Sequence, residues 1–153
     1  MIRSLLSALF VFAVCLAVAQ TNTAPTVKVV LPKTAKPGAT VAATIVLTFA
    51  DGLHGYQNPP TDEYQIPVKV SVDTKGFTLK KVSYPKGVMK SIGGDPKPCG
   101  VYEGTVKIPV VVTIPNKAGL AEAKFTVSYQ QCNDESCFPP AKVTGVAKLQ
   151  IKK

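Results

Sequence analysis

The chain has 153 residues, with 18 basic and nine acidic side chains and a formal net charge of +9. Arg3 is its single arginine, so the planar two-pronged contacts that arginine makes with phosphate or guanine are unavailable to the rest of the chain. We therefore interpret the scattered lysines as a solvated surface that resists aggregation, and we expect no nucleic-acid partner.

The first 19 residues have the pattern of a secretory signal peptide. Arg3 precedes an apolar run, and the small-residue motif AVA ends at Ala19. A membrane anchor is the alternative, but the run is shorter than the ~20 residues that span a bilayer. We expect cleavage after Ala19, export to the periplasm, and one mature domain, residues 20–153, that is not embedded in the membrane. Cys15 leaves with the signal, and the mature chain carries 17 lysines against nine acidic residues, a net charge of +8.

Alternation of apolar and polar residues dominates the mature chain. This period of two is typical of strands that bury one face of a sheet, and no segment shows a convincing helical period. Turn-forming Gly, Pro and Asp residues separate the alternating runs. The predicted strands are, in chain order, Val27–Leu31, Ala39–Phe49, Ile66–Asp73, Phe77–Ser83, Thr105–Ile114, Lys124–Gln130 and Lys142–Ile151. They predict an all-β, immunoglobulin-like β-sandwich of about seven or more antiparallel strands.

Two long segments, Asp51–Gln65 and Lys86–Gly104, lack this alternation. Loops of that length in a small domain are usually functional or mobile. His54 lies between glycines in the first segment, and we interpret it as an ordinary loop residue that nothing local places near the cysteines. Cys99 lies between Pro98 and Gly100 in the second, where we expect partial exposure rather than a core strand.

The stretch SYQQCNDESCFPP places Cys132 and Cys137 on either side of four turn-forming residues. Alternation puts Tyr129 in the core, so Cys132 is predicted to face outward if the strand continues without a bulge. A tight connection would set the two cysteines opposite each other, within the Cα separation of about 4.4 to 6.8 Å that a disulfide tolerates. A ring of about six residues stabilises by only about 2 kcal/mol, which favours reversible chemistry over a staple. Asp134 and Glu135 disfavour the thiolate, so we expect sluggish thiols until a partner docks.

Two alternatives to a redox pair remain open at this point. One is an inert disulfide that braces a hairpin. The other is a zinc site of Cys99, Cys132, Cys137 and His54, since the C-x4-C gap is permitted for such sites. Exported thiols tend to oxidise, so we expect no metal.

The cysteine segment, together with ADGLHGYQNPPTDEYQIP, VSYPKG and VYEGTVKIPVVVTI, resembles the N-terminal periplasmic domain of the thiol:disulfide interchange protein DsbD and its free-standing relatives. The resemblance runs from about Thr26 to Ile151. It implies an immunoglobulin-like sandwich that acts as a thiol:disulfide interchange oxidoreductase, with a redox-active disulfide and no other cofactor. A thioredoxin-like partner, itself fed across the inner membrane, would reduce the disulfide. The dithiol would then reduce oxidised periplasmic proteins, such as a disulfide isomerase or a cytochrome-maturation factor, and we expect the domain to be a monomer.

The same resemblance assigns roles to residues. Cys137 would form the mixed disulfide with a partner, and Cys132 would resolve it. The segment from about Met89 to Gly100 would be a cap loop that shields the pair, with Tyr102 and Glu103 anchoring its end. The cap and supporting residues are Ile92, Asp95, Cys99, Tyr102, Glu103, Tyr129, Asp134, Glu135 and Phe138.

Three features depart from the family pattern. The chain shows no membrane domain or thioredoxin domain, so the electron donor is expected to be a separate chain. The predicted cap carries Ile92, Gly93 and Gly94 where an aromatic residue is expected. Cys99 is a third mature cysteine. We expect it to stay a thiol beside an oxidised Cys132–Cys137 pair.

A function of a different class also remains open. The domain would then be a non-catalytic binding module that docks a partner through its long loops, and the disulfide would brace a hairpin. A zinc-binding domain is the third possibility.

Overall fold

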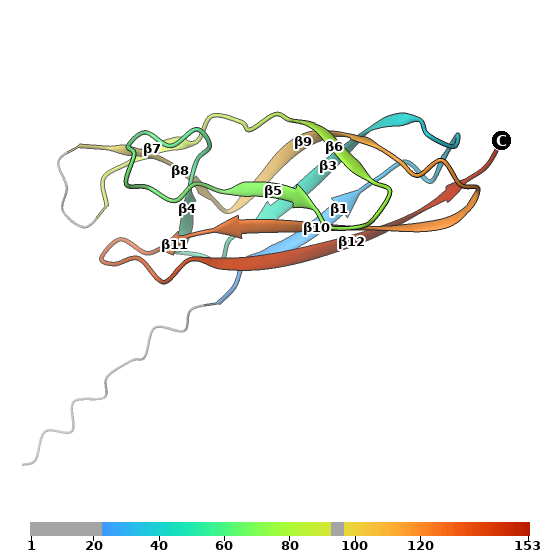
Figure 1. Cartoon of the computed structure of the whole chain (residues 1–153). Helices are drawn as coiled ribbons and strands as arrows, with labels where there is room; N and C mark the ends of the chain where they lie inside the picture. The colour runs from blue at the N-terminus through green and yellow to red at the C-terminus, as the bar shows by residue number, and fades with distance from the viewer. Residues whose placement is uncertain (1–22, 93–96) are drawn as a thin grey trace, which may run out of the picture.

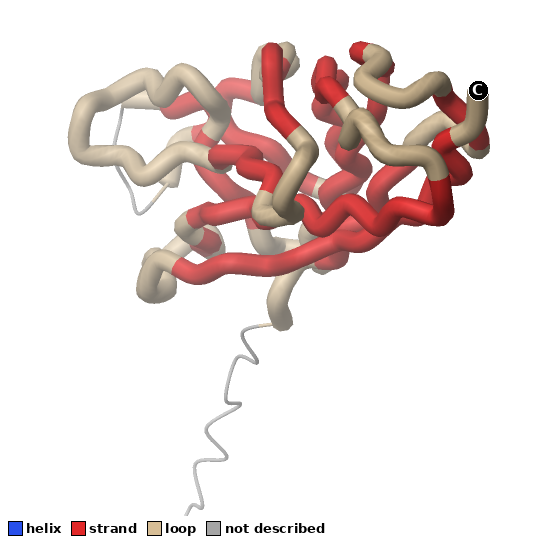
Figure 2. The backbone as a smooth tube through the Cα atoms, turned by 45° about the vertical axis from the view of Figure 1, so that its right-hand side comes forward, coloured by secondary structure: helices blue, strands red, loops and turns tan. Residues whose placement is uncertain are grey.

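The computed structural model describes residues 23–92 and 97–153, and within these ranges it is all β. The described residues form twelve strands in three four-stranded sheets and contain no helix (Figure 2). Consequently, this part of the chain holds no helix that is long and apolar enough to cross a membrane. The predicted signal peptide, residues 1–19, lies outside the described residues, and so does Asp95 of the predicted cap.

Two of the sheets face each other as the predicted immunoglobulin-like sandwich (Figure 1). The first has the order β1 (Thr26–Val30), β3 (Thr40–Thr48), β9 (Thr105–Thr113) and β6 (Thr78–Val82). The second has the order β2 (Thr34–Ala35), β12 (Ala141–Ile151), β10 (Gly119–Tyr129) and β5 (Lys69–Val72). All seven predicted strands are present. Their pairing is antiparallel as expected, and only the two-residue β2 pairs in parallel, with β12.

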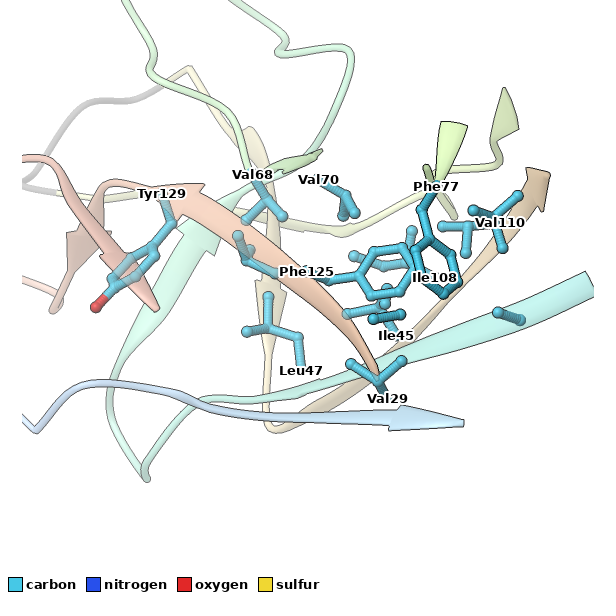
Figure 3. Packing of buried hydrophobic residues seen from close by; sticks show 14 of the residues in the cluster. Val29, Ile45, Leu47, Val68, Val70, Phe77, Ile108, Val110, Phe125 and Tyr129 are labelled. Atoms are coloured by element: carbon cyan, nitrogen blue, oxygen red, sulfur yellow. The ribbon is translucent and has the colours of Figure 1, made fainter. Parts of the chain in front are cut away.

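The core lies between these two sheets because the alternating apolar residues of both point inward. Ile45 and Leu47 of β3, Ile108 of β9 and Phe125 of β10 are completely buried. Figure 3 shows Phe125 among aliphatic side chains contributed by several strands. Ile66 departs from the predicted alternation, since it is 41% exposed and precedes β5. The sandwich thus has a continuous apolar interior that does not involve the cysteines.

The third sheet forms one end of the molecule, on the left in Figure 1. Its order is β11 (Gln131–Cys132), β4 (His54–Tyr56), β8 (Cys99–Glu103) and β7 (Val88–Lys90). The prediction that 51–65 and 86–104 are irregular throughout is therefore wrong. These strands are short and lack alternation, and they form because distant segments pair with one another.

Candidate functional site

The cysteine segment begins where the chain passes from one sheet to another. β10 ends at Tyr129, Gln130 belongs to no strand, and Gln131–Cys132 then pairs with β4 of the third sheet. Tyr129 is buried as predicted and makes an edge-to-face contact with Phe49, with ring centroids 6.3 Å apart. Because the chain changes sheets here, the alternation of inward and outward side chains along β10 does not extend to Cys132, although the predicted orientation of Cys132 depended on it.

Cys132 and Cys137 are joined by the predicted disulfide and form an antiparallel β-bridge. The backbone N–H of Asn133 donates to the backbone carbonyl of Ser136 at 2.9 Å, and the backbone N–H of Phe138 donates to the backbone carbonyl of Gln131 at 2.8 Å. This pattern makes the cysteines a non-hydrogen-bonded pair, the closer of the two antiparallel pairings. Their Cα atoms are accordingly 4.0 Å apart, slightly below the expected range.

The turn between the cysteines is fixed by a buried side chain. Asn133 is 7% exposed, and its Oδ1 accepts hydrogen bonds from the backbone amides of Glu135 at 2.9 Å and Ser136 at 2.7 Å. An Asn side chain that bonds the backbone in this way reproduces a turn locally. The hairpin that carries the disulfide is therefore held from inside as well as by its own strand pairing.

The two sulfur-bearing residues differ sharply in exposure. Cys132 has an exposed fraction of 0%, whereas Cys137 is exposed. The prediction that Cys132 faces outward is wrong because the strand does not continue through Gln130, and three consecutive residues, Gln131, Cys132 and Asn133, are buried. A protein partner can approach the bond only from the side of Cys137.

His54 is the residue opposite Cys132 on β4. Its exposed fraction is 0%, and among the described residues neither ring nitrogen has a hydrogen-bond partner. Such an unsatisfied buried group costs about 1–3 kcal/mol, so its presence calls for a reason. The prediction that His54 is an ordinary loop residue away from the cysteines is wrong, because Gly55 lets β4 pack closely against Phe49: a Cβ added at Gly55 would lie 2.7 Å from its ring.

The register places four residues in one row across the third sheet. Cys137 pairs with Cys132, Cys132 with His54, and His54 with Glu103. Residues directly opposite one another project from the same face of a sheet, with Cβ atoms about 4.5–5.5 Å apart. The disulfide, the imidazole and a carboxylate therefore share one face.

Lys90 links this row to the strand that enters the predicted cap. Its Nζ lies 2.9 Å from Asp134 Oδ1 and 3.5 Å from Glu103 Oε2. The hydrogen bond to Asp134 raises the pKa of Lys90, and the same bond lowers the pKa of Asp134. Burial lowers the pKa of His54, and the charge of Lys90 lowers it further, so the imidazole is neutral at pH 7. Both acidic residues between the cysteines are exposed, and Asp134 is paired with a lysine.

A cleft of about 450 Å³ opens beside the exposed sulfur. Cys137, Tyr56, Ile92, Cys99 and Glu135 are among the residues that line it. The Tyr56 hydroxyl lies 3.4 Å from Cys137 Sγ, and it is the donor because a disulfide sulfur carries no hydrogen. Burial raises the pKa of Tyr56, which keeps the hydroxyl protonated.

Cys99 begins β8 instead of lying in an irregular segment. It pairs with Lys90 of β7, is 8% exposed, and its Sγ donates to the Lys90 carbonyl at 3.4 Å. The predicted partial exposure is therefore wrong. Cys99 is a thiol outside the disulfide, on the wall of the cleft that also contains Cys137.

The 51–65 segment holds the base of the predicted cap. The backbone N–H of Gln57 donates to the Gly100 carbonyl at 3.0 Å, and the side-chain Oε1 of Gln57 accepts from the backbone N–H of Gly87 at 2.9 Å. The Gly100 amide donates to Thr61 Oγ1 at 3.1 Å. A Cβ at Gly100 would lie 2.3 Å from the Gln57 side chain, so a larger residue there would displace the end of that side chain and its bond to Gly87.

The remaining predicted site residues fall into different surroundings. Tyr102 is 3% exposed and belongs to the core; its hydroxyl donates to the Pro85 carbonyl at 2.6 Å. Glu103 lies in the row with His54, and Ile92 is half-buried in the cleft wall. Phe138 is half-buried and pairs through its backbone with Gln131. The shielding of the disulfide by residues 89–100 remains a prediction.

Sequence reasoning missed His54, Tyr56 and Lys90 as neighbours of the disulfide. His54 and Tyr56 do alternate around Gly55, which is the one local signal of a strand that presents both on one face. No local signal marks Lys90. Within the described ranges, no cluster of three or more His, Cys, Asp or Glu residues is arranged to hold a metal ion.

A sandwich with a disulfide hairpin at one end defines a β domain with a candidate thiol–disulfide site. The sequence profile of the family described as "Thiol:disulfide interchange protein DsbD, N-terminal" matches residues 23–147. The chain therefore belongs to this family of domains from thiol:disulfide interchange proteins.

A solved structure gives the same architecture. The N-terminal periplasmic domain of ScsB from Proteus mirabilis aligns with a TM-score of 0.52 and 12% identity, over 77% of this chain and 43% of that one. The chain thus spans less than half of that ScsB structure. The reduced N-terminal domain of DsbD from Neisseria meningitidis aligns with a TM-score of 0.48 and 19% identity, over 83% of this chain and 91% of that one. A comparison with curated protein sequences gives no match.

Proposed function

We propose that the protein is a periplasmic thiol–disulfide exchange module that takes two electrons from a thioredoxin-like donor and passes them to oxidised proteins. The observation that carries this proposal is the asymmetry of the disulfide, which is exposed at Cys137 and buried at Cys132. Membership of the DsbD N-terminal family supports it. We further propose that residues 1–19 are removed as a signal peptide and that the mature domain acts as a monomer.

Reduction begins when a donor thiolate attacks Cys137 Sγ. The bond between the two sulfurs breaks, the electron pair goes to Cys132 Sγ, which takes up a proton, and a mixed disulfide links the donor to Cys137. The second thiolate of the donor then attacks the donor sulfur of that mixed disulfide and releases Cys137 as a thiolate. The donor leaves oxidised, and the domain holds the dithiol.

Transfer to an acceptor follows the same steps in reverse. The Cys137 thiolate attacks the acceptor disulfide and forms a second mixed disulfide. Cys132 loses its proton and attacks Cys137 Sγ, which releases the acceptor as a dithiol once its two sulfurs are protonated. The cleft beside Cys137 is where a partner's cysteine-bearing loop would lie, and residues 89–100 would cover it, since Ile92, Pro98 and Cys99 already line it.

The test is the reduction potential of the Cys132–Cys137 bond. The purified protein without residues 1–19 is equilibrated in glutathione buffers, and its thiols are counted by alkylation and mass. The proposal predicts a potential of roughly −180 to −270 mV, within reach of thioredoxin-like donors. A potential well below about −300 mV, with no reduction by any thioredoxin-like protein, would instead favour a binding module with a structural disulfide.

A further inference from the structure

The exchange proposed above leaves a buried sulfur that must gain and lose a proton. Cys132 has no exposed surface, so solvent does not reach its sulfur directly. A thiolate formed in such surroundings is disfavoured by desolvation, which slows both the opening and the closing of the disulfide. A group beside Cys132 that exchanges a proton with it would remove this obstacle.

His54 is the side chain placed to do so. It lies directly opposite Cys132 in the register of β4 and β11, on the same face of the sheet, and it is equally buried. Both of its ring nitrogens lack a hydrogen-bond partner among the described residues, so neither is committed to another group. We propose that His54 is the general acid and base of Cys132, an inference that rests on the exchange function proposed above.

The step balances without any further reactant. When Cys132 resolves a mixed disulfide on Cys137, the basic ring nitrogen takes the Cys132 thiol proton, and Cys132 Sγ attacks Cys137 Sγ. The partner sulfur leaves with the bonding electron pair and is protonated by His54 or by water. In the opposite direction the ring N–H stabilises the sulfur anion that forms at Cys132, and the imidazolium, once protonated by water, supplies the proton that this sulfur takes up.

The charges around the imidazole keep it in the form that accepts a proton. Lys90 from β7, Glu103 from β8 and Asp134 from the hairpin turn face it, and Lys90 is paired with both carboxylates. Burial and then Lys90 lower the pKa of His54, while Asp134 and Glu103 oppose that shift. The base is therefore available at pH 7.

Ring closure can be followed separately from the first attack. The reduced protein, with Cys99→Ser so that two thiols react, is mixed with one equivalent of the aromatic disulfide DTNB. The exposed Cys137 releases the first coloured thiolate, and attack by Cys132 on the resulting mixed disulfide releases the second in a first-order step. We compare the parent with His54→Phe and His54→Gln; the control is Lys148→Met, which removes a lysine paired with Glu122 between β12 and β10, away from the third sheet and from both cysteines.

The expected result is that both His54 variants slow the second release about 100-fold at pH 7, the lower range of general acid–base effects, while the first release hardly changes. In the parent, the closure rate levels off above the lowered pKa of His54. In the variants it rises about tenfold per pH unit until the Cys132 thiol ionises. Lys148→Met should leave the second release and its pH profile unchanged.

Folded variants that close the ring at the parental rate would overturn the proposal, and so would a parental closure rate that rises tenfold per unit throughout pH 5–8. This second outcome needs no variant, so misfolding of His54→Phe or His54→Gln does not prevent the test. The assay uses no protein partner. A domain that thioredoxin-like proteins never reduce, but whose closure depends on His54, would contradict the proposed function and leave this inference standing.

Discussion

The two cysteines of the disulfide lie in different surroundings, and this difference supports the different roles that we propose for them. Cys137 is exposed beside an open cleft, with the Tyr56 hydroxyl as a hydrogen-bond donor. Cys132 is completely buried and lies opposite His54 in the strand register. An attacking sulfur must approach along the axis of the bond that it breaks, and here that approach is open only toward Cys137.

In Cys132→Ser, the Cys137 thiolate should therefore attack the disulfide of an oxidised thioredoxin-like protein and be trapped in a mixed disulfide with it. No internal thiol remains opposite Cys137 to resolve it, so the adduct should accumulate and be visible by non-reducing electrophoresis. The matched variant is Cys137→Ser, which leaves only the buried sulfur and should trap little. Trapping through Cys132 in that second variant, and not through Cys137 in the first, would reverse the roles.

Cys99 allows a separate prediction, because it lines the same cleft as Cys137 without joining the disulfide. A ring closed within the hairpin forms more easily than a bond reaching from β8. We therefore expect the oxidised protein to keep Cys132–Cys137 as its dominant linkage and Cys99→Ser to retain most exchange activity. Peptide mapping without reduction measures this; a dominant linkage from Cys99 to either cysteine would make it part of the redox centre.

For single residues, the sequence predicted which two cysteines form the disulfide but not which of them is exposed to solvent. The C-x4-C spacing and its turn residues were enough to pair the cysteines. The orientation of Cys132 depended on a strand continuing past Tyr129, and Gln130 ends it because the next residues pair in another sheet. His54 was missed for a related reason, since its neighbour Cys132 is 78 positions away in sequence and only pairing brings them together.

Among the elements, the third sheet decides how the site is built. Its strands come from four separate parts of the chain, and each has five residues or fewer. Long alternating runs such as β3 and β9 reveal themselves in the sequence because one face of each is buried by the core. The short strands of the third sheet have no such alternation. Their glycines, such as Gly55 and Gly100, are typical of loops in sequence, but in the structure they allow close packing against neighbouring side chains.

Lys90 ties β7 to the cysteine hairpin, and its removal should loosen that contact. In Lys90→Met the chain length is kept but the pairs with Asp134 and Glu103 are lost. We expect Cys132 of the reduced protein to be alkylated severalfold faster, because local opening of the third sheet becomes easier. Global stability should hardly change, since solvent screens exposed ion pairs.

The matched control is Lys148→Met, which removes a lysine paired with Glu122 at 3.7 Å between β12 and β10, away from the third sheet. Its alkylation rate should equal that of the parent. Raising the salt concentration should move the parent toward the Lys90→Met rate. Equal Cys132 alkylation in Lys90→Met and the parent would show that the lysine does not hold the hairpin in place.

At the scale of the whole molecule, the stabilising core and the redox hairpin occupy different regions. The apolar cluster lies between the two large sheets, and neither cysteine of the disulfide belongs to it. β10 and β12 pair over eleven residues, from Gly119 opposite Ile151 to Tyr129 opposite Ala141, before the hairpin begins. The sandwich is thus complete without the bond.

Removing the disulfide should consequently leave the protein folded. We expect Cys132→Ala with Cys137→Ser to abolish electron transfer and to lower the free energy of unfolding by about 2–3 kcal/mol, the loss calculated for a small ring. Alanine is chosen at the buried position so that no hydroxyl is left without a partner. Denaturant unfolding of both proteins gives the difference, and a variant that is unfolded without denaturant would identify the pair as structural.

The backbone hydrogen bonds on either side of the cysteine pair have a kinetic consequence. The bonds from Asn133 to Ser136 and from Phe138 to Gln131 do not involve the sulfurs, so they hold the two residues face to face whether or not the sulfurs are joined. A reduced pair held in this way has a very high effective concentration of one thiol at the other, and closing needs no search by the chain. In a mixed disulfide between Cys137 and a partner, the Cys132 thiol would therefore be in position to attack as soon as that disulfide has formed. The lifetime of the mixed disulfide would then be set by the rate at which the Cys132 thiol loses its proton.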